Sequence, residues 1–238
     1  MPEANLTNLL NIIAATGALG TAAMGLVDAF KVFWGGPSNF GYGFIKAAVK
    51  RFAPDTADGP VAFRQKDVLR TLRANWLNGD SAADQKAKAR AMIHLRLTQG
   101  DAAALAKLVG VDAEVLQSAA TKATKGEKVS PEEVSVLGQF DAVLSAVLDE
   151  AYERADQKYR NAAKLLAVIV ATALALFAGW LIQDQPAAGS PPAPPYLGSA
   201  RFWVCLIAGL ISAPIAPVAK DLTTALQNAV AAARAVKV

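Results

Sequence analysis

The longest regular pattern of apolar and polar positions in this sequence covers residues 130–183. It opens with Ser130, Pro131 and Glu133, a helix start in which the Ser side chain accepts a backbone N–H and the Glu side chain bonds back to the Ser N–H. Apolar residues then recur every three or four positions as far as Tyr159, with charged residues between them, as in an amphipathic helix. No helix stop follows, so the pattern predicts one continuous helix through the segment.

The second half of this predicted helix is apolar on all sides. Leu165–Ile182 contains no charged residue over eighteen positions, which matches a hydrocarbon core of roughly 30 Å at about 1.5 Å per residue. Leu9–Val27 and Phe202–Ala219 have the same character. The predicted fold class is therefore an all-α integral membrane protein with three transmembrane helices, of which the second continues as a long amphipathic cytoplasmic helix.

The patterns divide the chain into seven consecutive segments. We expect an N-terminal transmembrane helix at 1–34, an interfacial helix and linker at 35–60, a small cytoplasmic helical domain at 61–129, the long helix at 130–183, a Pro-rich external loop at 184–200, a third transmembrane helix at 201–219 and a C-terminal amphipathic helix at 220–238. The Pro-rich loop is expected to be a stiff connection, because Pro-rich segments favour extended conformations.

Short helices with their own caps fill the predicted cytoplasmic domain. Ser81 and Asp112 each precede a helical run and are the expected N-cap residues, and another helix is expected at Asp101–Val109. These helices hold too few large apolar residues for a core of their own, whereas the long helix offers Phe140 and Leu144 on one side. We therefore expect the short helices to pack on the long helix.

Residues 40–52 form a short segment with two contrasting sides. Aromatic and aliphatic residues alternate at helical spacing with Lys46, Lys50 and Arg51. This pattern is typical of a helix that lies on an anionic membrane surface, which makes the three cations candidate membrane-surface residues. A helix packed on the soluble domain has the same pattern, and the sequence leaves that alternative open.

Small residues and prolines mark two features of the spans. Gly17, Thr21 and Gly25 repeat every four positions, so they share a helix face that another helix can approach closely. On the third span, Pro214 and Pro217 each remove a backbone donor and are expected to kink the helix. We therefore expect a homo-oligomer whose third span is bent.

Charged residues at the ends of the spans predict a polar cluster and an orientation. Asp28 on the first span and Lys220 with Asp221 after the third span fall at the same depth. They form a polar cluster at the inner mouth of a helix bundle or simply mark the membrane boundary. Basic residues gather at one set of span ends, namely Lys31, Lys158, Arg160, Lys164 and Lys220. The positive-inside rule then puts the N-terminus and the loop outside and the main domain in the cytoplasm, in a bacterial-type inner membrane.

Composition agrees with a membrane protein that carries one soluble part. Hydrophobic residues make up 53% of the 238 residues and charged residues only 18%, with a formal net charge of +4. We interpret the basic excess as membrane orientation and expect the lipid bilayer, not nucleic acid, as a partner. A soluble protein that hides an apolar hairpin among its helices is a less favoured alternative.

The sequence holds few residues that could carry catalysis. With one histidine, His94, and one cysteine, Cys205, it lacks the set needed for a nucleophilic triad or a zinc site. His94 stands among apolar and basic neighbours and is expected to be a partly buried helix residue. We therefore expect no catalytic residue, no metal and no cofactor.

These patterns favour a non-enzymatic oligomeric membrane scaffold or assembly component that presents a helical platform to a cytoplasmic protein partner. The alternative is an oligomeric pore or channel lined by the kinked third span and Asp28. A pore-lining helix needs a polar stripe along its length. The spans hold only a few hydroxyl residues, which favours the scaffold; they are Thr16, Thr21, Thr172 and Ser212.

Overall fold

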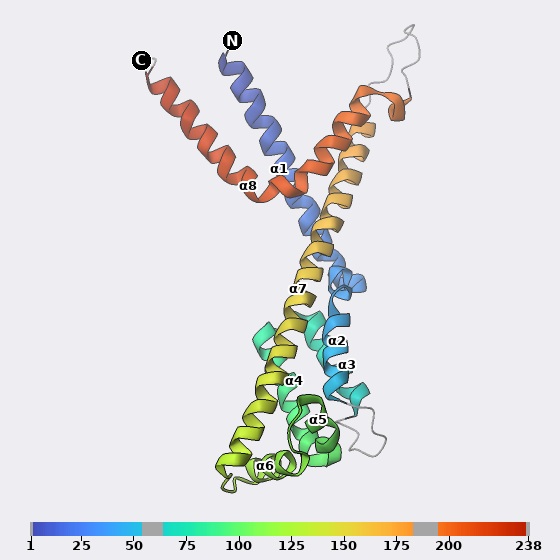
Figure 1. Ribbon diagram of the computed structural model, residues 1–238. Helices are drawn as coiled ribbons and strands as arrows, with labels where there is room; N and C mark the ends of the chain where they lie inside the picture. The colour runs from blue at the N-terminus through green and yellow to red at the C-terminus, as the bar shows by residue number, and fades with distance from the viewer. Residues whose placement is uncertain (1, 54–63, 183–194, 237–238) are drawn as a thin grey trace. The chain divides into compact units, whose positions relative to one another are not determined.

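The computed structural model describes residues 2–53, 64–182 and 195–236. In these ranges the chain is helical and contains no β-strand, which confirms the expected all-α class. The contacts divide the chain into two compact units, the first of Met1–Pro37 with Arg160–Val238 and the second of Ser38–Tyr159. Helix α7 contributes to both units, because their boundary falls inside it (Figure 1).

The first unit contains the long apolar helices. They are α1 (Pro2–Trp34), the second part of α7 (Pro131–Leu181) and α8 (Ala200–Val236), with the 3-10 turn η4 (Tyr196–Gly198) before α8. All three helices are long and apolar enough to cross a membrane, through Asn11–Phe30 in α1, the apolar part of α7 and Ala200–Ala219 in α8. Each predicted span is therefore helical over its described length.

Polar contacts join the end of α7 to the start of α8. Arg201 Nη1 donates a hydrogen bond to the carbonyl oxygen of Ile182 at 2.8 Å. The Tyr196 hydroxyl donates to the carbonyl oxygen of Leu176 at 2.9 Å. The last carbonyls of a helix have no partner inside it, so Arg201 supplies a donor that this helix end lacks.

The second unit consists of short helices and the first part of α7. Before α7 it contains α2 (Tyr42–Phe52), α3 (Gln65–Asn78), α4 (Ala82–Arg96), the π-helical turn η3 (Leu97–Asp101), α5 (Ala102–Val109) and α6 (Ala113–Lys125). A 3-10 turn, η1 (Gly36–Asn39), lies at the boundary of the two units along the chain.

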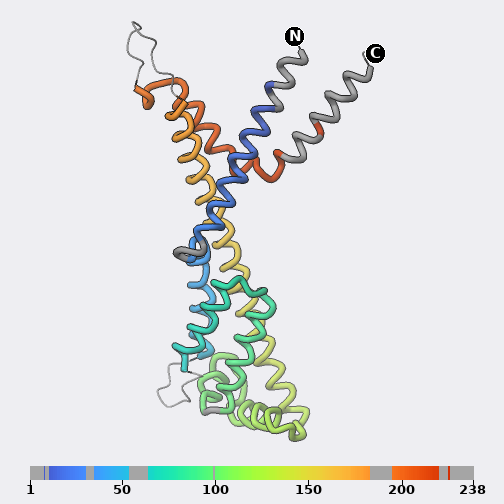
Figure 2. The backbone as a smooth tube through the Cα atoms, turned by 180° about the vertical axis from the view of Figure 1, so that it is seen from behind, coloured from blue at the N-terminus to red at the C-terminus, as the bar shows by residue number. Residues whose placement is uncertain are grey.

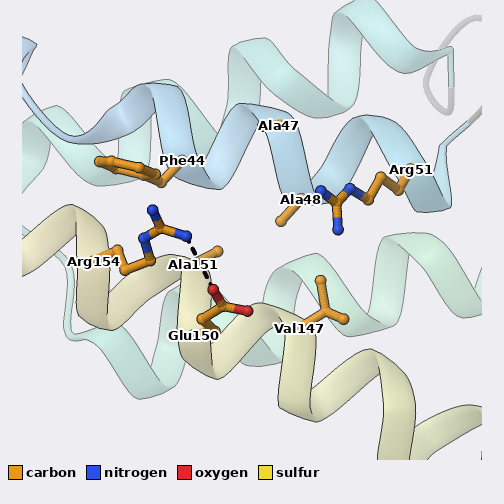
Figure 3. A pocket seen from close by; sticks show the side chains of 8 residues that line it. All are labelled: Phe44, Ala47, Ala48, Arg51, Val147, Glu150, Ala151 and Arg154. Carbon is orange, nitrogen blue, oxygen red and sulfur yellow. Dashed lines mark hydrogen bonds and ion pairs between the residues drawn. The ribbon is translucent and has the colours of Figure 1, made fainter.

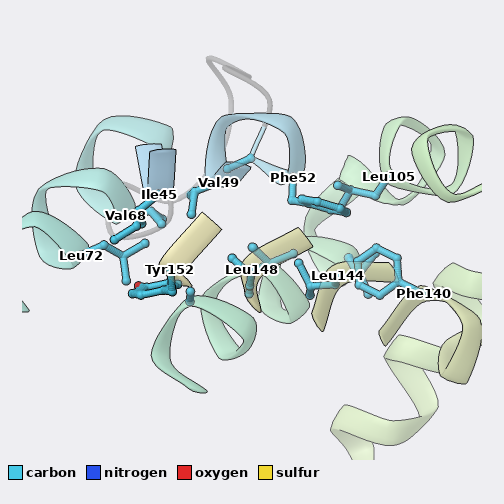
Figure 4. Packing of buried hydrophobic residues seen from close by; sticks show 14 of the residues in the cluster. Ile45, Val49, Phe52, Val68, Leu72, Leu105, Phe140, Leu144, Leu148 and Tyr152 are labelled. Carbon is cyan, nitrogen blue, oxygen red and sulfur yellow. The ribbon is translucent and has the colours of Figure 1, made fainter. Parts of the chain in front are cut away.

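An apolar core holds the second unit together. From α7 it takes Phe140, Leu144, Leu148 and Tyr152, all at most 3% exposed. Residues of the shorter helices pack around them (Figure 4), namely Ile45, Val49 and Phe52 of α2, Val68 and Leu72 of α3, Ile93 of α4, Leu105 of α5 and Leu116 of α6. This confirms the expected packing of the short helices on the long one. Each fully buried Leu or Phe contributes roughly 1.5–3 kcal/mol.

The predicted caps are present at three helix starts. Ser81 Oγ and Asp112 Oδ1 each accept the N–H of the residue three positions later, at 3.1 and 2.9 Å. At the start of α7 the capping box is reciprocal. Ser130 Oγ accepts the Glu133 N–H at 3.3 Å, and Glu133 Oε2 accepts the Ser130 N–H at 2.7 Å.

The helix expected from Asp101 is present as α5, which begins at Ala102 with Asp101 as its N-cap residue. The chain continues from α4 into α5 through the π-helical turn, and Asp101 makes no side-chain cap. Its carboxylate instead accepts a 2.6 Å hydrogen bond from Arg96 Nε, and both side chains are buried. Burying a carboxylate without a charged partner is costly, so Asp101 bonds to Arg96 and does not cap the helix. Gly100, at φ +103°, lets the turn widen with little strain.

The apolar side of α2 lies inside this core. Ile45 and Val49 are fully buried, and Phe52 packs edge-on against Phe140 with ring centroids 6.2 Å apart. These side chains are already covered by protein and are not available to insert into lipid. The packing therefore agrees with the alternative that the sequence left open, a helix packed on the soluble domain.

Candidate functional site

The predicted self-association face of α1 is divided between an internal contact and an open surface. Gly17 is buried so closely against Ala219 of α8 that a Cβ on Gly17 would clash with the Ala219 methyl group. Thr21 and Gly25 are exposed, and no described atom lies within 4 Å of a Cβ built on Gly25. Self-association stays a prediction, for which Thr21 and Gly25 offer the open part of the face.

Other glycines set the crossings among the apolar helices. Helix α1 crosses α8, as Figures 1 and 2 show from opposite sides, and a Cβ on Gly20 of α1 would clash with the carbonyl group of Ser212. Gly209 of α8 lies so near α7 that a Cβ on it would stand 2.5 Å from Thr172 Cα. Small residues allow this close approach of backbones. Sequence reasoning missed Gly20 and Gly209, because only a regular four-residue spacing was taken as a signal.

The hydroxyl groups of the apolar helices bond to their own backbones. Thr16, Thr21, Thr172 and Ser212 each donate a hydrogen bond of 2.8 or 2.9 Å to a carbonyl three or four residues earlier. Such bonds satisfy the donor inside its own helix. None of these four hydroxyl groups therefore has its proton free to donate to water in a pore.

The predicted kink and inner-mouth cluster involve α8 and α1. Pro214 and Pro217 lie inside the continuous helix α8, whose ribbon changes direction partway along its length (Figure 1). Asp28 is exposed on α1, near the end of the apolar stretch. The side chains of Lys220 and Asp221 lie outside the part that the structure describes, so the polar cluster stays a prediction.

The three candidate membrane-surface cations lie on the exposed side of α2. Lys46, Lys50 and Arg51 are all exposed, and no carboxylate among the described residues pairs with them. Because the apolar side of α2 is buried in protein, a membrane-surface role for these residues would rest on charge alone. That role stays a prediction.

Arg51 also lines a small cleft between α2 and α7, with a volume of about 90 Å³ (Figure 3). On the α7 side, Arg154 donates to Glu150 at 3.0 Å, and its guanidinium lies 4.8 Å from the centre of the Phe44 ring. Alanine and valine side chains line the rest of the cleft. Sequence reasoning missed this site, because its two walls are about a hundred residues apart along the chain and only tertiary packing brings them together.

His94 is one of several polar residues at the contact between α4 and α7. Its Nε2 lies 2.5 Å from Asp141 Oδ1, and Arg90 approaches the same carboxylate oxygen at 3.8 Å. Two turns before His94 on α4, Lys86 donates to Asp149 at 2.6 Å. The expectation of a partly buried helix histidine is confirmed. Its carboxylate partner was not predicted, since no local signal links residues that far apart.

Two core tyrosines in the second unit remain protonated at neutral pH. Tyr42 donates to the carbonyl oxygen of Leu69, and burial raises its pKa to about 12 although the nearby charge of Arg73 lowers it. Burial also raises the pKa of Tyr152, whose hydroxyl has no hydrogen-bond partner among the described residues. Neither phenol therefore ionises near pH 7.

Neither the arrangement of possible metal-binding side chains nor comparison with known proteins assigns a chemical role to these sites. Among the residues that the structure describes, no group of three or more His, Cys, Asp and Glu side chains is placed to hold a metal ion. No protein-family model, no curated protein and no solved structure matches this chain. Its function is therefore inferred from its own residues and contacts.

Proposed function

We propose that this chain is a non-enzymatic membrane scaffold or assembly component that self-associates through its apolar helices and presents its second unit to cytoplasmic protein partners. The open face of α1 at Thr21 and Gly25 carries the proposal. Helices in lipid gain little from hydrophobic burial, so they associate where small residues let backbones approach and gain dispersion contacts. A second copy of the chain has the matching face.

The second unit supports the scaffold role by its construction. It has its own apolar core, and charged side chains cover much of the outside of α4 and α7. Helix α7 is unbroken over its 51 residues and belongs to both units. Helix α7 thus contributes residues both to the second unit and to an apolar segment.

The bonding of the span hydroxyls favours the scaffold over the pore. A conducting path needs polar groups directed at water along the whole span. The four span hydroxyls donate to their own helices instead, and the exposed side chains of the spans are largely apolar, as at Ile12, Ile169 and Ile207.

A bulky side chain on the open face tests self-association. In the full-length chain, Gly25→Leu should shift the particle to a smaller assembly, because the added side chain separates the helices but meets nothing inside the chain. Ala15→Leu is the matched control, since Ala15 is exposed on α1 about 80° around the helix from Gly25 and about 120° from Thr21. Gly17→Leu is unsuitable, because it would disrupt the internal contact with Ala219.

The measurement is particle mass, by light scattering or mass photometry, in detergent and in lipid nanodiscs. A monomeric wild type, or a Gly25→Leu variant with the wild-type mass, would remove the proposed self-association. Ion flux through the wild-type chain in liposomes, abolished by Asp28→Asn, would replace the scaffold by a channel.

A further inference from the structure

More positive than negative side chains line the cleft between α2 and α7. Two guanidinium groups and one carboxylate line it, for a net charge of +1. Arg154 is neutralised by Glu150 at 3.0 Å and covers the face of the Phe44 ring. Arg51 has no carboxylate partner among the described residues. The positive potential of the cleft therefore comes mainly from Arg51.

Two further cations lie on the same helix, outside the lining of the cleft. Lys46 and Lys50 are exposed on α2 and, in the described part of the chain, neither pairs with a carboxylate. The excess of positive charge among the residues that line this concave surface concentrates counter-ions there. An anion is thus the ligand that this surface attracts.

The size and shape of the cleft narrow the choice of anion. Its volume of about 90 Å³ lies below the roughly 300–1,000 Å³ of sites that enclose a whole small molecule. It therefore holds one small anionic group. In Figure 3 the Arg51 side chain extends along α2 with its guanidinium beside Ala48, and Arg154 stands on the facing helix. A guanidinium fork matches the oxygens of a phosphate group.

We propose that this cleft is a binding site for a phosphate group, with Arg51 as the principal donor and Arg154 as the second. The methyl groups of Ala48 and Ala151 and the Phe44 ring form an apolar wall for whatever the phosphate is attached to. Glu150 holds Arg154 in place and also repels the anion. The affinity for the anion therefore depends on the balance of these two effects of Glu150, and substitutions of Arg154 and of Glu150 should change it in opposite directions.

The phosphate can belong to an anionic lipid headgroup or be free in solution. Only seven residues separate the end of α1 at Trp34 from the start of α2 at Tyr42, and α1 is long and apolar enough to cross a membrane. The experiment therefore uses an anionic phospholipid as well as free inorganic phosphate. The site does not depend on the proposed self-association, since all its residues come from one chain.

The test measures binding to the full-length chain in a non-ionic detergent by calorimetric titration. The probes are inorganic phosphate and short-chain phosphatidic acid, with phosphatidylcholine, which has no net charge, as the reference lipid. Arg51→Gln and Arg154→Gln should each weaken binding about tenfold or more, because each removes charged hydrogen bonds. Glu150→Gln should strengthen binding several-fold, because it removes the repelling charge.

Lys125→Gln is the charge-matched control and should bind like the wild type. Lys125 ends α6, before the first residue of α7 at Pro131. Glu150, which lines the cleft, lies nineteen residues after Pro131, or about 29 Å along the helix. Circular dichroism on heating checks that each variant is folded.

The two probes distinguish the source of the phosphate. Binding of inorganic phosphate and phosphatidic acid alike assigns the site to the phosphate group itself, and binding of phosphatidic acid alone assigns it to a lipid headgroup. The proposal is overturned if neither probe binds the wild type, if Arg51→Gln binds like the wild type, or if folded Glu150→Gln binds more weakly.

Discussion

At the scale of single residues, Gly41 controls the approach of α2 to α7. Its φ of +106° lies where residues with a side chain are strained. A Cβ on Gly41 would also clash with the backbone carbonyl of Ala155, a fully buried residue of α7. The absence of a side chain is therefore needed both for the turn into α2 and for the helix contact. Gly43, two residues later, has open space around it.

This difference predicts opposite outcomes for two neighbouring substitutions. Gly41→Ala should lower the free energy of unfolding by about 1–3 kcal/mol, from backbone strain alone, with the clash against Ala155 added. Gly43→Ala should raise it by up to about 1 kcal/mol, because alanine restricts the unfolded chain and favours a helix. Denaturant unfolding of the full-length chain, followed by circular dichroism, measures both. Equal effects would contradict the role of Gly41.

At the scale of secondary structure, the start of α7 is also a connection to α6. Glu133 Oε1 accepts hydrogen bonds from Ser118 at 2.6 Å and from Lys122 at 2.7 Å, both on α6, while Oε2 closes the capping box with Ser130. The bonds from Lys122, Ser118 and Ser130, in that order of size, lower the pKa of Glu133 from 4.5 to about 2. One carboxylate thus caps a helix and joins two helices.

The lowered pKa of Glu133 predicts a loss of stability in acid. Its pKa is lower in the folded chain than in the unfolded chain, so its ionised form stabilises the fold above pH 4.5. That contribution is lost as the pH falls from 4.5 toward 2. Thermal unfolding of the full-length chain between pH 7 and 2 should show the loss.

Replacing Glu133 with a neutral residue separates its contribution to the pH dependence of stability from that of the other carboxylates. Glu133→Gln should lower the unfolding temperature at pH 7 and should reduce its dependence on pH below 4.5. Glu127→Gln is the control, because Glu127 is exposed in the loop before α7. If the two variants have the same pH dependence, Glu133 does not act as described.

At the scale of the whole chain, the arrangement of charges predicts which side of a membrane each segment occupies. Lys158, Arg160 and Lys164 precede the apolar part of α7, whereas Arg201 is the basic residue at its far end. Basic residues are retained on the cytoplasmic side. The region between α6 and α7 should then be cytoplasmic and the η4 turn external.

Single cysteines in a Cys205→Ala background test this orientation. Glu127→Cys lies in the loop before α7, and Leu197→Cys lies in η4, where Leu197 is 74% exposed. A membrane-impermeant thiol reagent added to intact cells should label Leu197→Cys alone. Glu127→Cys should react only after the membrane is opened. Labelling of both, or of Glu127→Cys alone, in intact cells would contradict the orientation.

The sequence by itself determined the elements of this protein. The apolar stretches of α1, α7 and α8, the caps at Ser81 and Asp112, and the unbroken length of α7 could all be predicted. Each depends on residues within a turn or two of one another, where helix periodicity and backbone hydrogen bonding act locally. Even here, the Asp101 side chain pairs with buried Arg96 and does not cap α5.

Only the tertiary structure decided which faces meet. An amphipathic pattern shows that α2 must bury one side, but protein and lipid can both cover it, and the core around Phe52 is what covers it here. Likewise, small residues allow a close contact without naming the partner, and Gly17 meets Ala219 some two hundred residues away. The cleft of Arg51 and Arg154 arises in the same way. Contacts between distant segments depend on packing of whole helices, which no local pattern encodes.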